Sequence, residues 1–423
     1  MKNKFYLPVH VLLVVCFCIS SIFGQLVNDV SSLLEKPNVK KAFEYIREIE
    51  PETIEEQIKL TEIPAPTFQE QKRGLYFKKR FEEIGLSNVR IDSVGNVIGE
   101  RNGKGGKDAP TLVLAAHLDT VFAMETKLET RREGTIIKLP GISDDGRGLT
   151  LLLAIAKTLE KHGIETIGNI IFVANVGEEG LGDLKGVRHL FNVELKDRIT
   201  HFISIDGAGL GVTTGAVGSK RYRVTFSGRG GHSYGAFGMA NPIHAVGRLI
   251  AKVSNFQTPV DPKTTFSVGM IRGGTSVNSI ARTASFDIDM RSRDPYELSR
   301  LDKRFKQNAQ AALDEENARW KNKGKIRLDI KLIGDRPTGT QPQDSPIIQV
   351  AASANKFMKI ENDFGFSSTD SNMPISIGVP AITIDGGGKG KGAHSLDEQW
   401  DSKDSHIGSQ RALLIALGVV GVQ

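Results

Sequence analysis

The stretch Thr111-Leu-Val-Leu-Ala-Ala-His117 decides the fold class of this chain. An almost unbroken apolar run of this length is typical of a strand that is buried on both faces of a parallel sheet. Similar runs recur at Asn169–Ala174 and His201–Ile205, and a helix is predicted between the first two runs, over Leu149–Glu160. Strands that alternate with helices indicate an α/β domain. We therefore expect a mixed, mostly parallel sheet covered by helices.

The middle of the chain follows a different pattern. Its predicted elements occur in the order β-α-β-β-α-β, which is that of a ferredoxin-like unit. Strands are expected at Arg221–Phe226, Thr265–Ile271, Thr283–Arg291 and Ile326–Ile333, and helices at Pro242–Val253 and Pro295–Trp320. We therefore predict an inserted lid or dimerisation domain at residues 217–333, within a catalytic domain made of residues 25–216 and 334–423.

The composition is that of an ordinary soluble protein. The chain has 423 residues, enough for several cores, and 39% of them are hydrophobic and 25% charged. These values exclude a disordered chain, a fibrous repeat and a protein with many membrane spans. The formal net charge of +6 is too small to indicate a nucleic-acid partner. The two cysteines, Cys16 and Cys18, both lie close to the start of the sequence.

Residues 1–24 are predicted to be a signal peptide. Lys2 and Lys4 precede an apolar run over Val9–Phe23, and Gly24 offers a small residue at the cleavage point. A membrane anchor is the alternative, but the run is shorter than the roughly 18 apolar residues of a spanning helix. We expect an exported, periplasmic protein that keeps no membrane attachment and no cysteine after cleavage, so that a thiolate metal site is excluded.

Acidic and imidazole side chains follow the predicted strands. The carboxyl ends of parallel strands meet at one edge of a sheet, so these side chains should lie close together. Carboxylates gathered in this way repel one another and raise one another's pKa values, and such a cluster is tolerated mainly around cations. The sequence therefore predicts a metal site. The side chains concerned are those of His117, Asp144, Glu178, Glu179, Asp206 and His394.

Short motifs in a fixed order strengthen this prediction. They are His117-Leu-Asp-Thr-Val121, Ser143-Asp-Asp-Gly146, Gly177-Glu-Glu-Gly180, Ile205-Asp-Gly207, Gly273-Gly-Thr-x-x-Asn278 and the late His394. Together they resemble the di-zinc exopeptidase family, which includes peptidase T, glutamate carboxypeptidase and succinyl-diaminopimelate desuccinylase. The resemblance covers nearly the whole chain after the first segment. Gly146-Arg147 departs from the Lys-Gly of many relatives, and the aspartate at 206 suits the peptidase T side.

The resemblance implies a role for each of these residues. Asp144 would bridge two metal ions, with His117 and Asp206 completing one site and Glu179 and His394 the other. Imidazole and carboxylate ligands suit zinc, with cobalt or manganese as alternatives. Two further roles follow from the same resemblance: Glu178 as the general base and Asp119 as the group that orients the ring of His117.

The predicted lid contributes three more candidate residues. In relatives, a histidine at the position of His232 approaches the oxyanion or the substrate, whereas Asn278 and Arg291 match positions that hold polar groups of the substrate. From the residues alone, His232 would be a turn histidine bonded to the backbone, and Arg291 a solvated charge. The resemblance favours a homodimer in which the partner's His232 enters the site, while closure within one chain stays open.

The expected function is a metal-dependent exopeptidase that acts on short peptides, with an aminopeptidase on di- or tripeptides as the first choice. A carboxypeptidase or an N-acyl-amino-acid amidohydrolase would use the same metal site. A distant alternative is a serine hydrolase, because Gly231-His-Ser-Tyr-Gly235 satisfies G-x-S-x-G, and Asp370 and His394 follow Ser233 in the required order. However, the sharp turn between strand and helix that this motif needs is absent from the sequence.

Overall fold

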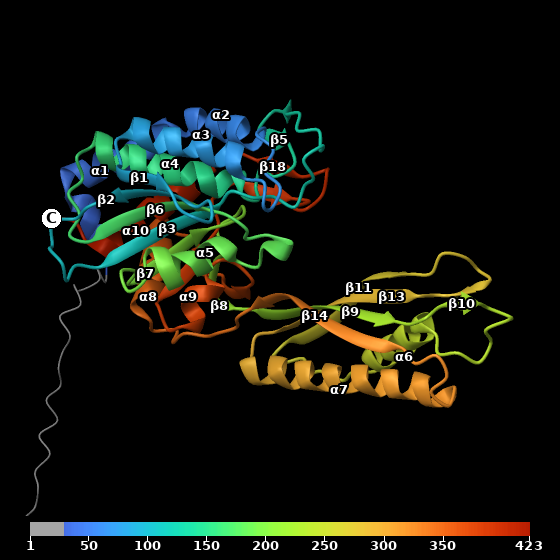
Figure 1. Ribbon diagram of the computed structural model, residues 1–423. Coiled ribbons are helices and arrows are strands. Elements are labelled where there is room, and N and C mark those ends of the chain that lie inside the picture. The colour runs from blue at the N-terminus through green and yellow to red at the C-terminus, as the bar shows by residue number, and fades with distance from the viewer. Residues whose placement is uncertain (1–28) are drawn as a thin grey trace, which may run out of the picture.

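An eight-stranded sheet forms the centre of the larger part of the molecule (Figure 1). The computed structural model describes residues 29–423, so the predicted signal peptide and both cysteines lie outside the described residues. The strands lie in the order β1 (Ser87–Ile91), β2 (Val97–Arg101), β6 (Asn169–Asn175), β3 (Thr111–His117), β7 (His201–Ile205), β16 (Ala381–Ile384), β8 (Val212–Ala216) and β15 (Phe364–Ser367). Its central strands β6, β3, β7 and β16 run parallel. The antiparallel pairs are β1 with β2, β2 with β6 and β8 with β16, whereas β15 pairs parallel with β8. The predicted mixed, mostly parallel sheet is confirmed.

Side chains of β3 alternate between two cores, as expected for a strand buried on both faces. Leu112 and Leu114 pack into a large core, whereas Val113 and Ala115 pack into a second core on the opposite face. The helices of the larger part are α1 (Pro37–Glu48), α2 (Glu50–Thr61), α3 (Gln71–Ile84), α4 (Gly146–Lys161), α5 (Lys185–His189), α8 (Pro346–Met358), α9 (Asn372–Ser376) and α10 (His406–Val420). Within residues 29–423, no helix is both long and apolar enough to cross a membrane.

The lid contains a four-stranded antiparallel sheet of its own. Its strands lie in the order β11 (Thr264–Gly273), β13 (Thr283–Ser292), β9 (Gly218–Ser227) and β14 (Arg327–Arg336). Helices α6 (Pro242–Ser254) and α7 (Pro295–Arg319) cover one face of this sheet around a separate hydrophobic core (Figure 1). The predicted order β-α-β-β-α-β is confirmed. The domain limits at 217 and 333 stay predictions.

Several short strands carry no periodic signal in the sequence. A second four-stranded sheet has the order β17 (Lys389–Lys391), β18 (Gln399–Asp401), β5 (Ile136–Lys138) and β4 (Arg131–Glu133). At the end of the lid, β10 (Gly231–His232) pairs with β12 (Ser279–Ile280). Strands of two or three residues are too short for an alternation of polar and apolar residues to be read. They nevertheless matter here, because the first set holds the chain around His394 and the second holds His232.

Candidate metal centre and active site

The predicted metal donors lie at one edge of the large sheet. His117 is the last residue of β3, and Asp206 directly follows β7. Glu178 and Glu179 lie in the loop after β6, and Asp144 comes shortly before α4. All five line one cavity of about 440 Å³. The carboxyl ends of the strands thus bring these side chains together, as predicted.

Asp144 lies between the two imidazoles. Its Oδ1 is 3.0 Å from His117 Nε2, and its Oδ2 is 2.9 Å from His394 Nε2. His394 Nε2 is also 3.0 Å from Glu179 Oε1, and Asp206 Oδ1 lies 4.0 Å from His117 Nε2. The predicted donors therefore form two groups that share Asp144, one with His117 and Asp206 and the other with Glu179 and His394, which is the arrangement that the family resemblance implies.

The electrostatics of this cluster indicate a place for cations. Burial by itself would lower the pKa of His117, but contacts with Asp119 and Asp144 outweigh burial and raise this pKa well above its usual value. Hydrogen bonds to Asp144 and Glu179 raise the pKa of His394 to about 10. Burial and the charge of Asp144 raise the pKa of Asp206 well above its usual range. A buried site that holds protons this firmly carries excess negative charge, and a set of imidazole and carboxylate donors fits a divalent cation.

Asp119 orients more than the histidine ring. His117 Nδ1 lies 3.0 Å from the backbone oxygen of Asp119, whereas the nearest carboxylate oxygen of Asp119 is 3.5 Å away. The carboxylate accepts hydrogen bonds from the backbone N–H groups of Glu178, at 3.0 Å, and Glu179, at 2.9 Å. The hydrogen bond to His117 that was predicted for the Asp119 carboxylate is thus made by the Asp119 backbone carbonyl. Both carboxylate oxygens instead accept hydrogen bonds from the loop after β6.

Three arginines also line this cavity. Arg291 was predicted, whereas Arg221 and Arg336 were missed. Arg221 Nε and Arg291 Nε lie 3.1 Å and 2.6 Å from the two carboxylate oxygens of Asp289. The clean alternation of polar and apolar residues over Thr283–Arg291 could have put Asp289 and Arg291 on one face. Arg221 could be found only from the cross-strand register, in which it pairs with Asp289.

The structure does not bring His232 and Asn278 to the metal donors. Neither residue lines the cavity of the site. They lie together at the end of the lid, where the backbone N–H of Ser233 donates to the carbonyl of Asn278 at 2.9 Å. His232 Nδ1 accepts from the backbone N–H groups of Tyr234 and Gly235, at 3.2 Å and 3.3 Å. Within one chain, His232 is therefore a turn histidine bonded to the backbone.

The same placement speaks against the serine-hydrolase alternative. Ser233 lies in the β10 turn of the lid, while His394 contacts Asp144 and Glu179 at the large sheet. Asp370 is fully buried and accepts a hydrogen bond from Asn175 Nδ2 at 2.6 Å. No serine–histidine–aspartate hydrogen-bond chain joins these three residues in the described part of the molecule.

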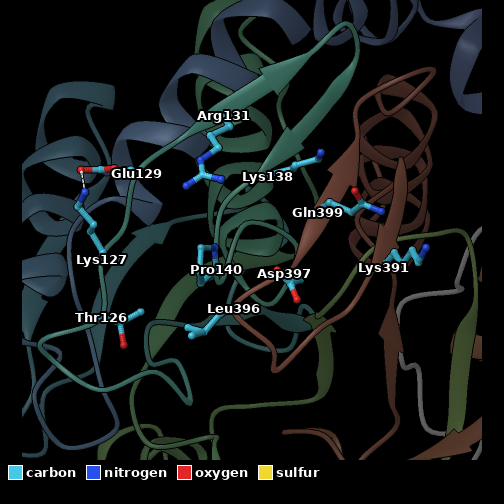
Figure 2. Close-up of a pocket in the computed structure, with 10 residues that line it drawn as sticks. All are labelled: Thr126, Lys127, Glu129, Arg131, Lys138, Pro140, Lys391, Leu396, Asp397 and Gln399. Atoms are coloured by element: carbon cyan, nitrogen blue, oxygen red, sulfur yellow. Dashed lines mark ion pairs between the residues drawn. The ribbon is translucent and has the colours of Figure 1, made fainter.

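A second cavity, of about 590 Å³, lies beside the small sheet of β17, β18, β5 and β4. Its basic side chains come from the β4–β5 hairpin, from the loop before it and from β17 (Figure 2). Lys127 Nζ lies 2.7 Å from Glu129 Oε1. This cavity is the larger of the two, but none of the predicted catalytic or metal residues lines it. The convergent donors favour the smaller cavity as the active site.

Comparisons with known proteins find similarity to peptidases and related hydrolases. Residues 214–317 match the model of the peptidase dimerisation domain, and residues 96–229 match that of peptidase family M28. Carboxypeptidase G2 from Pseudomonas sp. is 27% identical over 231 residues, which cover 52% of this chain and 54% of that protein. IAA-amino acid hydrolase ILR1-like 2 from Arabidopsis thaliana is 24% identical over 295 residues, or 66% and 64% of the two chains. The similarity thus spans between half and two thirds of these curated relatives.

A solved structure extends the likeness of fold to most of the chain. Aminopeptidase PepT from Bacillus cereus superposes with a TM-score of 0.70 and 19% identity, covering 88% of this chain and 98% of that one. At this identity the likeness concerns the fold alone. The superposed fold and the matches to the peptidase dimerisation domain and to peptidase family M28 are consistent with the di-zinc exopeptidase family that the sequence resembles.

Proposed function

We propose that this protein is a metal-dependent exopeptidase that hydrolyses short peptides, with Glu178 as the general base. One observation carries the proposal: Glu178 is buried in the same cavity as the metal donors, yet it pairs with Arg336 and with neither imidazole. A carboxylate beside a metal site that is not needed as a ligand is available for proton transfer. Burial raises the pKa of Glu178 to about 8, although the charge of Arg336 lowers it.

The donor set would hold two divalent cations, with zinc favoured over cobalt or manganese. His117 and Asp206 would hold one ion, Glu179 and His394 the other, and Asp144 both. When bound, such ions polarise the scissile carbonyl and lower the pKa of the attacking water. Asp119 keeps the loop of Glu178 and Glu179 in register with His117 through its two backbone hydrogen bonds.

Glu178 would move the proton. Its Oε1 accepts from Arg336 at 2.8 Å, and its Oε2 accepts no hydrogen bond from the described residues. Oε2 is therefore the atom that can take a proton from the attacking water and return it to the leaving nitrogen. The scissile C–N bond breaks as the proton arrives, and no covalent bond to the protein is formed.

The lid arginines indicate which end of the substrate lies nearby. Arg221 and Arg291 share Asp289, which holds two guanidinium groups at the wall of the cavity. Guanidinium groups are well suited to bind a carboxylate. This favours a substrate with a free carboxyl terminus close to the scissile bond, as in a di- or tripeptide cleaved by an aminopeptidase.

A carboxypeptidase or an N-acyl-amino-acid amidohydrolase is the second candidate. The arginines would serve its substrates equally well, and the similarity to carboxypeptidase G2 and to IAA-amino acid hydrolase ILR1-like 2 supports it. The two candidates differ in their need for a free amino group. Metal-loaded protein should be incubated with free, N-blocked and C-amidated tripeptides and the first product identified. Cleavage limited to N-blocked substrate would refute the aminopeptidase and favour the second candidate.

We also propose that the protein is an exported homodimer. The match to the dimerisation domain supports self-association, and β11 is an edge strand of the lid sheet with exposed Met270 and Ile271. Exposed edge strands are prone to pair with another chain. A dimer could bring the partner's His232 to the site to stabilise the oxyanion, and closure of the lid within one chain is the other route. Signal cleavage is tested by sequencing the amino terminus of the exported protein.

A further inference from the structure

Arg336 connects the lid to the proposed general base. It is the last residue of β14, where it pairs with Ser219 of β9, and it is only 4% exposed. Its Nη1 donates to Glu178 Oε1 at 2.8 Å and to Ser368 Oγ at 3.1 Å. Its Nη2 donates to the backbone carbonyl of Glu178. A single side chain at the end of a lid strand thus binds both the carboxylate and the backbone of Glu178.

Neighbouring contacts attach the same loop to the same two lid strands. The backbone N–H of Asp335 donates to Asp183 Oδ1 at 2.9 Å, and Arg188 Nη2 donates to the carbonyl of Asp335 at 2.6 Å. From β9, Arg221 Nη1 donates to the carbonyl of Gly180 at 2.7 Å. The loop after β6 is therefore held on one side by Asp119 of the large domain and on the other side by β9 and β14.

The form of the Arg336–Glu178 pair matters for catalysis. A buried ion pair contributes little to stability on balance, because desolvation of both charges offsets their attraction. It does, however, fix orientation, since a planar guanidinium that donates to a side-chain oxygen and a carbonyl at once permits few geometries. Pro337 follows Arg336 and favours an extended backbone before it, which limits the freedom of Arg336 further.

We propose that Arg336 is a positioning residue that orients the carboxylate of Glu178 and makes this orientation depend on the position of the lid. This inference rests on the proposed role of Glu178 as the base. With Oε1 held by Arg336, Oε2 is left without a hydrogen bond from the described residues and is available to take the proton. A shift of β14 relative to the large sheet would turn the carboxylate, so that the base is aligned only in one arrangement of the lid. A misplacement of about 1 Å can cost about a hundredfold in rate.

The test uses full-length, metal-loaded Arg336→Lys and Arg336→Gln. Lysine keeps the charge but cannot make the forked contact. We expect kcat to fall about tenfold to a hundredfold while KM changes less than about threefold. The bound metal per chain should stay as in the wild type. Arg101→Lys is the matched control: Arg101, the last residue of β2, also donates to a carboxylate and a carbonyl, those of Glu160 (2.6 Å) and Ile164, and it lines neither cavity. Its kcat should not change.

A double variant separates positioning from an independent effect. If Arg336 acts through Glu178, then Glu178→Ala combined with Arg336→Lys should be no slower than Glu178→Ala alone. The proposal would be overturned if the losses in kcat of the two single variants multiplied in the double variant, or if kcat of Arg336→Lys were unchanged. A wild-type protein that hydrolyses no peptide would instead refute the proposed function.

A crystal structure of the metal-loaded wild type tests the pair without any variant, which matters if the Arg336 variants fail to fold. Arg336 Nη1 should remain within about 3.5 Å of a carboxylate oxygen of Glu178. A wider separation in the metal-loaded protein would contradict the inference.

Discussion

The two sides of the active-site cavity are built in different ways. On one side, His117, Glu179 and Asp206 come at or after the ends of β3, β6 and β7, which belong to a single sheet, and Asp144 and His394 join them from the loops before α4 and after β17. On the other side, Arg221, Arg291 and Arg336 come from strands of the lid, which has a separate core. Most of the proposed metal donors thus follow strands of the large sheet, whereas the arginines that would contact the substrate come from a lid sheet with its own core.

Removal of the metal should have the largest effect. Because every proposed donor lies on the sheet side, chelation should abolish hydrolysis, and zinc or cobalt should restore it. Hydrolysis is followed with a short peptide before and after dialysis against chelator. A serine-directed acylating reagent should have little effect. The opposite pattern would favour a mechanism that uses Ser233.

Glu178→Ala comes next. It should lower kcat at least about a hundredfold, the usual contribution of a general base, and leave the metal content near that of the wild type. Glu179→Ala is the matched neighbour and should lose metal instead. Metal analysis of both variants checks the assignment. If Glu178→Ala empties the site, the roles of the two glutamates are reversed.

His232→Ala tests whether the lid of one subunit contributes to the active site of its partner. Loss of an oxyanion donor typically costs about a hundredfold to a thousandfold in kcat, with metal content unchanged. Mixing the inactive Glu178→Ala and His232→Ala variants should restore part of the activity if His232 acts in the partner's site. Subunits that exchange and yet remain inactive would exclude action across the dimer and leave closure within one chain.

Arg291→Ala should have a smaller effect, which concerns binding. Hydrogen bonds to charged groups are worth about 1.5–3 kcal/mol, so KM for a peptide with a free carboxyl terminus should rise about tenfold to a hundredfold. The C-amidated peptide should lose much less, since it lacks the carboxylate. Equal losses for both peptides would show that Arg291 does not bind that end of the substrate.

The smallest expected effect concerns the pH dependence of stability that His201 causes from within β7. Burial lowers the pKa of His201, in β7, to about 4. Because this value lies below the usual pKa of an unfolded histidine, near 6.5, the unfolded chain binds more protons between these two values. Stability should therefore fall as the pH drops from about 6.5 to about 4. His201→Gln should reduce this dependence in urea unfolding at several pH values, whereas an unchanged slope would contradict the assignment.

Much of the donor side could be predicted, because its signals are local. The strand that ends at His117 and the acidic pair at Glu178 and Glu179 are visible within a few residues each. The hydrogen bonds of the Asp119 carboxylate could not be predicted in this way, because they depend on the tertiary placement of the loop after β6. The order of strands and helices in the lid was likewise readable from alternation and helical spacing.

The sequence by itself determined the α/β class, the inserted ferredoxin-like unit and a set of candidate metal donors, because hydrophobic period and residue type are properties of short segments. Only the tertiary structure decided that Arg221 and Arg336 face the site and that His232 does not. Those outcomes depend on strand register and on how the lid sheet, which contains β9 and β14, lies against the large sheet. Both are set by long-range packing, which no local pattern of residues records.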